Sequence, residues 1–367
     1  MRVGIVGCGK ISDTYLKNLT ASSEVEVVAC SDVLLERARE KAAEFGVPKA
    51  CTNEELLLDA TIELVVNLTV PVAHAEVTLA AIAAGKHVLT EKPLAVNMSD
   101  ARRIRTEAEA RKVTVACAPD TFLGPGFQTS LALLRDGRLG EPLAAAAFRI
   151  RPGPESWHPN PLVFYSPGAG PLLDVGVYYV THLVCLLGPV RRVTGISRIL
   201  YPELNPVAGP RAGETIKVTT PTWITGVLEF ASGAQAILVS SFGIAGDDLP
   251  HMHVYCAGGI LSVPDPNTFA GPVMVRDNDP DSAWREEPLL FEPTTVRADS
   301  RGIGVVEAVR AIREGRAPRA SLDLGYHVLE VMLSILESSD TGEHVSIESS
   351  CPPPEPLPAD ARLAAAT

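Results

Sequence analysis

Short apolar runs that alternate with helix-like stretches over the first 120 residues constrain the fold of this chain more than any other feature. The strand-like runs cover five segments, at residues 2–6, 26–30, 64–68, 87–90 and 114–118. Several are apolar throughout rather than alternating, which is typical of central strands buried on both faces. With helix-like stretches between them, they form a repeated β-α-β pattern. This pattern predicts an α/β fold that begins with a parallel, doubly wound sheet.

The pattern changes after residue 121. Longer strand-like runs with hairpin-type turns follow, interrupted by an apolar helix at residues 171–187. They predict a second, α+β domain built on a large, mostly antiparallel open sheet. We therefore expect a parallel-sheet domain over residues 1–121 and an α+β domain over residues 122–349. A loosely held tail rich in Pro and Ala is expected over residues 350–367.

Charge and composition exclude several kinds of partner. A net charge of −12 would repel both nucleic acid and an anionic membrane surface. No run approaches the roughly 20 apolar residues that span a bilayer, and the N-terminus lacks the features of a secretory leader. The seven cysteines are scattered without C-x-x-C spacing, and no His, Cys and Asp cluster has metal-ligand spacing. We expect a cytoplasmic protein that binds no nucleic acid, membrane or metal.

A glycine-rich segment follows the first strand and opens the first helix. It reads Gly7-Cys8-Gly9-Lys10-Ile11-Ser12. Glycines there permit a tight turn and let backbone N–H groups approach a pyrophosphate at the positive end of the helix. The third glycine of the usual motif is replaced by serine, which is still small enough for close helix–strand packing. The segment predicts a Rossmann dinucleotide-binding domain, although glycine-rich turns of this kind also occur without ligands.

Asp32 strengthens this interpretation and indicates which cofactor is bound. It ends the second strand, where a carboxylate hydrogen-bonds the adenosine ribose hydroxyls. Because a carboxylate repels a 2′-phosphate, NAD is favoured over NADP. Arg37 keeps NADP open, since a nearby arginine could accommodate that phosphate. The alternative for Asp32 is a solvated residue that only caps the next helix.

Lys92 lies at the end of the fourth strand, in the segment Thr90-Glu91-Lys92-Pro93. Ligands of doubly wound sheets gather beyond the carboxyl ends of the strands, so this side chain is expected to project toward the nicotinamide. A partly desolvated lysine has a lowered pKa and can pass a proton or hold a hydroxyl group. The alternative is an ordinary surface lysine before a loop proline, and position alone does not decide between the two.

The apolar helix at residues 171–187 carries Asp174, Tyr178 and His182 at intervals of four residues. This spacing predicts one polar stripe on an otherwise hydrophobic helix. A buried carboxylate needs a partner, which a lysine from the other domain would supply. The alternative for the tyrosine and histidine is a structural hydrogen bond in the core, and this alternative is favoured for His182.

Three further residues are weaker candidates for the substrate site. Trp157 and His158 lie shortly before a glycine-rich stretch and could form an aromatic wall of a sugar pocket. The alternative for both is a proline-rich surface loop. Asp120, which follows the fifth strand, is a candidate of the same kind.

Two motifs give the chain a family resemblance. One is the segment Ala84-Gly85-Lys86-His87-Val88-Leu89-Thr90-Glu91-Lys92-Pro93-Leu94. The other is Asp174-x-Gly176-x-Tyr178, which follows a glycine-rich stretch. With the Rossmann-like half before them, these motifs resemble the Gfo/Idh/MocA oxidoreductases, the family of glucose-fructose oxidoreductase and inositol 2-dehydrogenase. The resemblance runs from Met1 to about Ser349.

The resemblance implies roles for particular residues. Lys92 matches the family's catalytic lysine and Asp174 its substrate-site aspartate. Tyr178 stands where many members carry His, and it matches members similar to glucose-fructose oxidoreductase and dihydrodiol dehydrogenase. Near the pyrophosphate and the nicotinamide ribose, the resemblance places Thr69, Pro71, His74 and Glu91.

The expected activity is hydride transfer between NAD(H) and a hydroxyl-bearing carbon of a sugar, polyol or related compound. Lys92 and Tyr178 would handle the proton, with the phenolate favoured by the lysine's charge, and Asp174 would orient the lysine or a second substrate hydroxyl. The family also implies a homodimer or homotetramer formed through the open sheet. A trans-dihydrodiol or aldose 1-dehydrogenase is one alternative. A catalytically silent dinucleotide sensor is another, although retention of all three site residues favours an enzyme.

Overall fold

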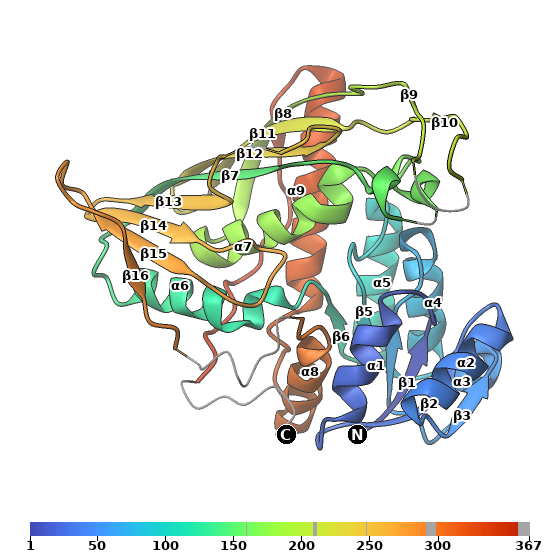
Figure 1. Cartoon of the computed structure of the whole chain (residues 1–367). Helices are drawn as coiled ribbons and strands as arrows, with labels where there is room; N and C mark the ends of the chain where they lie inside the picture. The colour runs from blue at the N-terminus through green and yellow to red at the C-terminus, as the bar shows by residue number, and fades with distance from the viewer. Residues whose placement is uncertain (159, 208–210, 247, 291–298, 359–367) are drawn as a thin grey trace.

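The computed structural model describes residues 1–367 except 159, 208–210, 247, 291–298 and 359–367. It contains a parallel sheet flanked by helices and a second, larger sheet with helices on one face (Figure 1). This arrangement confirms the predicted fold class. Among the described residues, no helix is long and apolar enough to cross a membrane. All seven cysteines are buried free thiols.

The first sheet has six parallel strands in the order β3-β2-β1-β4-β5-β6. Its strands are β1 (Arg2–Val6), β2 (Glu26–Ser31), β3 (Lys49–Cys51), β4 (Leu64–Asn67), β5 (His87–Thr90) and β6 (Val115–Cys117). Its helices are α1 (Ser12–Thr20), α2 (Leu35–Phe45), α3 (Asn53–Leu58), α4 (Pro71–Ala83) and α5 (Met98–Arg111). The strand order reverses beside β1, which pairs with both β2 and β4. In such sheets the ligand crevice lies at this point, beyond the carboxyl ends of the strands.

The second sheet has nine strands in the order β16-β15-β14-β13-β7-β12-β11-β8-β17. The strands are β7 (Pro142–Arg151), β8 (Val190–Arg198), β11 (Trp223–Phe230), β12 (Gln235–Phe242), β13 (Met252–Cys256), β14 (Gly259–Val263), β15 (Val273–Asp277), β16 (Arg285–Glu287) and β17 (Val345–Ser346). Only β7 and β12 pair in parallel; the other neighbours are antiparallel. The short strands β9 (Glu203–Leu204) and β10 (Ile216–Lys217) pair separately.

Four longer helices follow β6 in the chain. They are α6 (Pro125–Arg135), α7 (Val177–Leu187), α8 (Ile303–Glu314) and α9 (Leu322–Thr341). Four short helical turns are η1 (Thr121–Leu123), η2 (Pro154–Ser156), η3 (Pro161–Phe164) and η4 (Leu172–Gly176). Inward-facing side chains such as Leu228 and Leu238 are fully buried beneath the helices. The opposite face of the sheet stays open.

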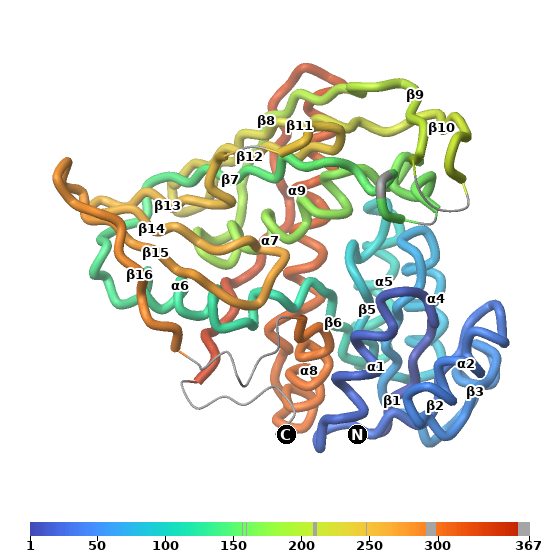
Figure 2. The backbone as a smooth tube through the Cα atoms, viewed as in Figure 1, coloured from blue at the N-terminus to red at the C-terminus, as the bar shows by residue number. Residues whose placement is uncertain are grey.

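The C-terminal helices return to the first domain. Figure 2 shows α8 beside α1, and Asn18 of α1 donates a side-chain hydrogen bond of 2.8 Å to the backbone oxygen of Arg301. Helix α9 packs against both α7 and β6. The backbone of Cys117 donates to that of Ala320 at 2.9 Å. The two domains therefore share a packed boundary, and the side chains at the carboxyl end of the parallel sheet meet those of α7.

The tail is held over its first part. Cys351 and Leu357 are 2% and 8% exposed. The backbone N–H of Leu357 donates to the side chain of Gln128 at 2.7 Å. The expectation of a loosely held tail is wrong for residues 350–358, because an apolar side chain among the prolines inserts into the core. Residues 359–367 lie outside the described residues.

Candidate active site

The glycine-rich segment forms a tight turn between β1 and α1. Gly7 has a φ of 102°, and a Cβ there would lie 2.7 Å from backbone atoms of Leu68, so only glycine fits. At Gly9 a Cβ would meet no atom within 4 Å, so the space in front of it is open. Ser12 is buried and its hydroxyl donates to the oxygen of Gly9 at 2.6 Å. An open turn at a helix N-terminus fits a pyrophosphate.

Asp32 ties this turn to the end of β2. Its Oδ2 accepts the backbone N–H of Cys8 and its Oδ1 that of Leu34, both at 2.9 Å. The side chain remains partly exposed, so each oxygen keeps a lone pair for a ribose hydroxyl. The two roles considered for this carboxylate, capping and ribose binding, are therefore compatible. Ile11 precedes the first turn of α1.

The loop after β4 is fastened to the segment that carries Lys92. Thr69 donates its hydroxyl to Asn67 at 2.7 Å, and Pro71 begins α4. His74 is buried, with Nδ1 2.7 Å from the oxygen of Pro93 and Nε2 3.0 Å from that of Thr69. Burial lowers the pKa of this imidazole, with both backbone contacts opposing the shift. Its contacts make it a link between two loops.

Glu91 is buried beside the same turn. Its Oε1 accepts the hydroxyl of Tyr15, in α1, at 2.6 Å. Its Oε2 accepts the backbone N–H of Lys92 at 3.1 Å. Glu91 therefore orients the backbone of the lysine.

The Lys92 amine meets Asp174 from the second domain. Its Nζ lies 2.9 Å from Asp174 Oδ1 and also donates to the backbone oxygen of that residue. The same nitrogen lies 5.2 Å from the centre of the Tyr178 ring. The side chains of the lysine and aspartate are 14% and 26% exposed. The surface-lysine alternative is thus wrong, and the pairing with a carboxylate from the apolar helix is confirmed.

The charge state of Lys92 differs from the sequence-based expectation. Burial by itself lowers the pKa of the amine, but the charges of Asp174, Tyr178 and Glu91 outweigh it and raise the pKa above its ordinary value. The expectation of a lowered pKa is therefore wrong for this arrangement of the site. The lysine is a cation that donates hydrogen bonds.

Arg301 is a site residue that sequence reasoning missed. Its Nη2 lies 3.4 Å from the Tyr178 hydroxyl and donates to Asn267 at 2.7 Å. Its Nη1 lies 2.7 Å from Asp299. Burial opposes its charge, but Tyr178 and Asp299 raise the pKa of the guanidinium further above its ordinary value. No periodicity links residue 301 to residue 178, so only the fold reveals the contact.

The polar stripe on α7 is only partly formed. Residues Leu172–Gly176 form a π-helical turn, which widens the helix before α7 begins. Asp174 and Tyr178 both face Lys92, whereas His182 is 1% exposed and packs edge-on against Phe127 at 4.5 Å. Burial lowers the pKa of His182 to about 4. Its Nδ1 lies 2.8 Å from the backbone oxygen of Tyr178, which is the structural contact that the sequence favoured.

The other weak candidates lie in different places. Asp120 is buried, and its Oδ2 accepts the N–H groups of Gly302 and Gly304 at the start of α8. Trp157 is 58% exposed. The amine of Lys10, a residue of the glycine-rich turn, lies 4.8 Å from the centre of its ring. The ring of His158 packs edge-on against that of Phe164, with their centres 4.8 Å apart. Pro159 of that segment lies outside the described residues.

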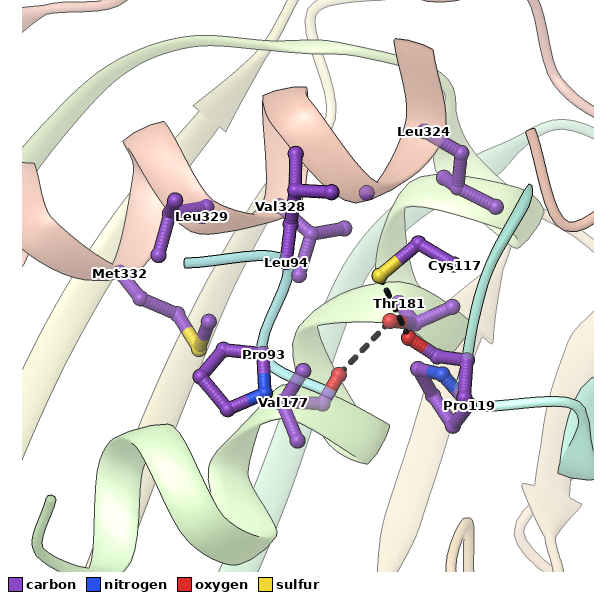
Figure 3. A pocket seen from close by; sticks show the side chains of 12 residues that line it. Pro93, Leu94, Cys117, Pro119, Val177, Thr181, Leu324, Val328, Leu329 and Met332 are labelled. Atoms are coloured by element: carbon purple, nitrogen blue, oxygen red, sulfur yellow. Dashed lines mark hydrogen bonds between the residues drawn. The ribbon is translucent and has the colours of Figure 1, made fainter. Parts of the chain in front are cut away.

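A small apolar cavity lies behind the site (Figure 3). Its lining includes Pro93 and Val177, which directly follow Lys92 and precede Tyr178, and side chains of α9 such as Val328. No charged side chain lines it, so it is a packing gap rather than a place for a sugar. Within the described ranges, no group of His, Cys, Asp and Glu side chains could hold a metal ion.

Comparison with known proteins agrees with this geometry. Residues 1–118 match the model of an oxidoreductase family with an NAD-binding Rossmann fold, Gfo/Idh/MocA. Residues 127–262 match the C-terminal domain of the same family. The chain belongs to this family. The predicted resemblance is confirmed, and so is NAD as the family's cofactor.

Individual relatives cover part of the chain. It is 32% identical over 181 residues to the 1,5-anhydro-D-fructose reductase of Ensifer adhaerens, covering 48% of this chain and 54% of that protein. It is 34% identical over 191 residues to the trans-1,2-dihydrobenzene-1,2-diol dehydrogenase of Macaca fuscata fuscata, covering 51% and 56%. These matches thus span little more than half of each relative's length. In fold, the chain resembles levoglucosan dehydrogenase in complex with NADH and L-sorbose, with a TM-score of 0.81, 19% identity and coverage of 95% and 99%.

Proposed function

We propose that this Gfo/Idh/MocA protein is an NAD(H)-dependent oxidoreductase acting on a hydroxyl-bearing carbon of a sugar, polyol or sugar derivative. One observation carries the proposal. At the carboxyl end of β5 the partly buried Lys92 amine lies 2.9 Å from Asp174 and 5.2 Å from the Tyr178 ring centre. A cation, a phenol and a carboxylate that converge at the ligand end of a Rossmann sheet can bind a hydroxyl group and move its proton.

The residues that would hold NAD fit its shape. The turn at Gly7 and Gly9 leaves room for the pyrophosphate, and Asp32 offers carboxylate oxygens to the ribose. We assign supporting contacts to the remaining predicted residues, which are Cys8, Lys10, Ile11, Ser12, Thr69, Pro71, His74 and Glu91. Bound NAD would supply the hydride acceptor at the nicotinamide C4.

The chain's own groups would handle the proton. Tyr178 takes it from the substrate hydroxyl in the oxidation direction and returns it to the carbonyl oxygen in reduction. Lys92 lies near the ring of Tyr178 and Arg301 near its hydroxyl, and both are cations. They stabilise the negative charge that develops on the phenol as the proton moves. Asp174 keeps the amine of Lys92 in place.

Two alternatives remain from different classes. A trans-dihydrodiol or aldose 1-dehydrogenase is favoured by the likeness to a relative named as a dihydrodiol dehydrogenase. The other is a silent NAD-binding sensor. Incubation with NAD and a panel of sugars, polyols, sugar derivatives including sugar acids, and trans-dihydrodiols, followed at 340 nm, separates them. We expect an absorbance gain with a sugar, polyol or sugar derivative. A gain only with trans-dihydrodiols supports the first alternative, and tight NAD binding with no gain supports the sensor.

We also propose that the protein forms a homodimer or homotetramer through the open face of the nine-stranded sheet. Val227 and Ile237 lie opposite each other on β11 and β12, and they are 42% and 43% exposed. Ile196 on the neighbouring β8 is 74% exposed. Adjacent exposed apolar side chains on a sheet favour burial against a second copy. Seven free thiols suit a reducing compartment, and we propose the cytoplasm.

A further inference from the structure

An arginine beside the active site lacks a partner. Arg149 lies near the end of β7, and its side chain is on the same face of the sheet as the buried Ala145 and Ala147, the face that α7 covers. Its Nη1 is buried without a hydrogen bond. Within the part of the chain that the structure describes, no carboxylate lies within ion-pair distance of this guanidinium.

The groups that surround Arg149 are already engaged. The charges of Tyr179, Asp265 and Asp174 raise the pKa of the Arg149 guanidinium, and that of Arg151 lowers it. Asp265 accepts the hydroxyl of Tyr179 at 3.1 Å and the backbone N–H of residue 267 at 3.0 Å. Asp174 is paired with the Lys92 amine at 2.9 Å. Arg149 pairs in register with Ser240 of β12, and the Ser240 hydroxyl donates to the backbone oxygen of Pro171 at 2.9 Å, directly before the turn that carries Asp174. Arg149 therefore lies beside the segment that supplies the catalytic carboxylate.

A partly buried guanidinium whose Nη1 is enclosed without a hydrogen bond is unfavourable in the absence of ligand. Desolvation of a charged group is costly unless hydrogen bonds replace the lost water, and this burial lowers the pKa of Arg149. Such a group is explained when a ligand completes its hydrogen bonds. The planar fork of arginine matches a carboxylate with two parallel hydrogen bonds.

We propose that Arg149 binds a carboxylate of the substrate, so that the substrate is a sugar acid rather than a neutral sugar. The proposal rests on the proposed function, because it places the carboxylate on the molecule whose hydroxyl Lys92 and Tyr178 handle. A single negative charge suits the site better than the two of a phosphate, since Asp174 and Asp265 lie close to the same guanidinium. Arg151, two residues along the same strand, adds a second cation on that side.

Matched pairs of ligands test the proposal. Dissociation constants are measured on the NADH complex for D-glucose and D-glucuronate, D-galactose and D-galacturonate, and D-sorbitol and D-gluconate. Glucose 6-phosphate serves as the phosphate arm. The proteins are the wild type, Arg149→Gln, Arg149→Lys and Arg102→Gln. Arg102 lies exposed on α5 and is the control for loss of one positive charge.

We expect at least one acid to bind roughly 10- to 100-fold more tightly than its neutral partner, as for a hydrogen bond to a charged group. Arg149→Gln removes this preference, Arg149→Lys retains part of it and Arg102→Gln leaves it unchanged. The proposal is overturned if no acid is preferred, if Arg149→Gln keeps the preference, or if glucose 6-phosphate binds more tightly than every acid.

Two readouts distinguish substrate binding by Arg149 from a structural role and from failure of the proposed function. If Arg149 had only a structural role, Arg149→Gln would lower the midpoint of thermal unfolding; relief of an unpaired buried charge predicts an unchanged or higher midpoint. Oxidation of neutral sugars at 340 nm without any acid preference overturns the carboxylate site and leaves the proposed function standing. Acid binding that depends on Arg149, with no hydride transfer to or from any ligand, overturns the proposed function and supports the carboxylate site.

Discussion

At the scale of single residues, the phenol of Tyr178 is the centre of the proposed mechanism. Lys92 approaches its ring from the first domain, and Arg301 approaches its hydroxyl from the segment before α8. The arginine is itself held by Asn267 and Asp299. Two fixed cations, one beside the hydroxyl and one beside the ring, stabilise a phenolate without reorganisation when a proton moves. Arg301 is thus a positioning residue that acts on the reaction through Tyr178.

Replacing Arg301 tests this role. We expect Arg301→Gln to lower kcat by about 100-fold, as for the loss of one donor to a developing oxyanion, with KM and the NAD dissociation constant little changed. Arg301→Lys should recover part of the rate because it restores the charge. Steady-state kinetics with the best substrate of the panel measure both variants. A kcat within about twofold of the wild type in Arg301→Gln would remove this residue from the mechanism.

The residues of the site were predictable from the sequence to different degrees. Lys92, Asp174 and Tyr178 could be assigned because a strand end, a buried helix and two motifs point to them. The direction of the Lys92 pKa could not, because burial and the nearby carboxylate act in opposite directions. The outcome depends on a distance of 2.9 Å that no sequence pattern specifies. Arg149 and Arg301 belong to no local motif, and only long-range packing brings them to the site.

At the scale of elements, the start of α8 depends on a residue from the first domain. Asp120 accepts the N–H groups of Gly302 and Gly304, which the helix itself leaves unpaired. Burial raises the pKa of this carboxyl to about 6, although both backbone hydrogen bonds and Arg301 act to lower it. Asp120 is therefore a helix cap that holds the segment carrying Arg301. The charge of this cap changes with pH.

A pH series of unfolding tests the cap. Because the Asp120 pKa rises from 3.8 to about 6 on folding, the folded state retains a proton that the unfolded state loses first. This group's stabilising contribution is therefore present below pH about 4 and is lost as pH rises through about 6. Asp120→Asn can still accept both N–H groups but cannot titrate. We expect the wild type to lose stability relative to this variant across that window, measured as thermal midpoints; parallel curves would contradict the assignment.

Helices and strands were predictable where their patterns are long. The apolar strands β1, β4 and β5 and the helices between them were found, whereas β3 was missed because its three residues, Lys49–Cys51, include no β-branched residue and follow a proline. The stripe of Asp174, Tyr178 and His182 assumed a regular α-helix. The π-helical turn at Leu172–Gly176 changes that geometry, and no local composition marks it.

At the scale of the whole molecule, the two faces of the nine-stranded sheet differ: one carries the proposed catalytic groups and the other is open. The helix-covered face meets the Rossmann domain and carries Arg149, while the open face exposes Ile196, Val227 and Ile237. Covering that face with a second copy would leave the catalytic side of each copy accessible. Assembly and catalysis are therefore separable by substitution.

A charged residue on the open face tests the assembly. We expect the wild type to be a dimer or tetramer in light scattering coupled to size exclusion, and Ile237→Glu to be a monomer at micromolar concentration, because a buried unpaired carboxylate disfavours association. Leu58→Glu is the control, since Leu58 is 76% exposed on α3 of the first domain. A monomeric wild type, or an Ile237→Glu variant that stays assembled, would contradict this interface.

Lys92 is the residue on which the proposed chemistry depends most, because its cation is assigned to stabilise the charge that develops on Tyr178 as the proton moves. The most direct measurement compares wild type and Lys92→Ala in the rate of absorbance change at 340 nm and in NAD affinity by calorimetry. We predict a loss of roughly 100- to 1,000-fold in turnover, in the range of a lost group that stabilises developing charge, with NAD affinity within about threefold of the wild type. Turnover retained in Lys92→Ala would contradict the proposed role of this lysine.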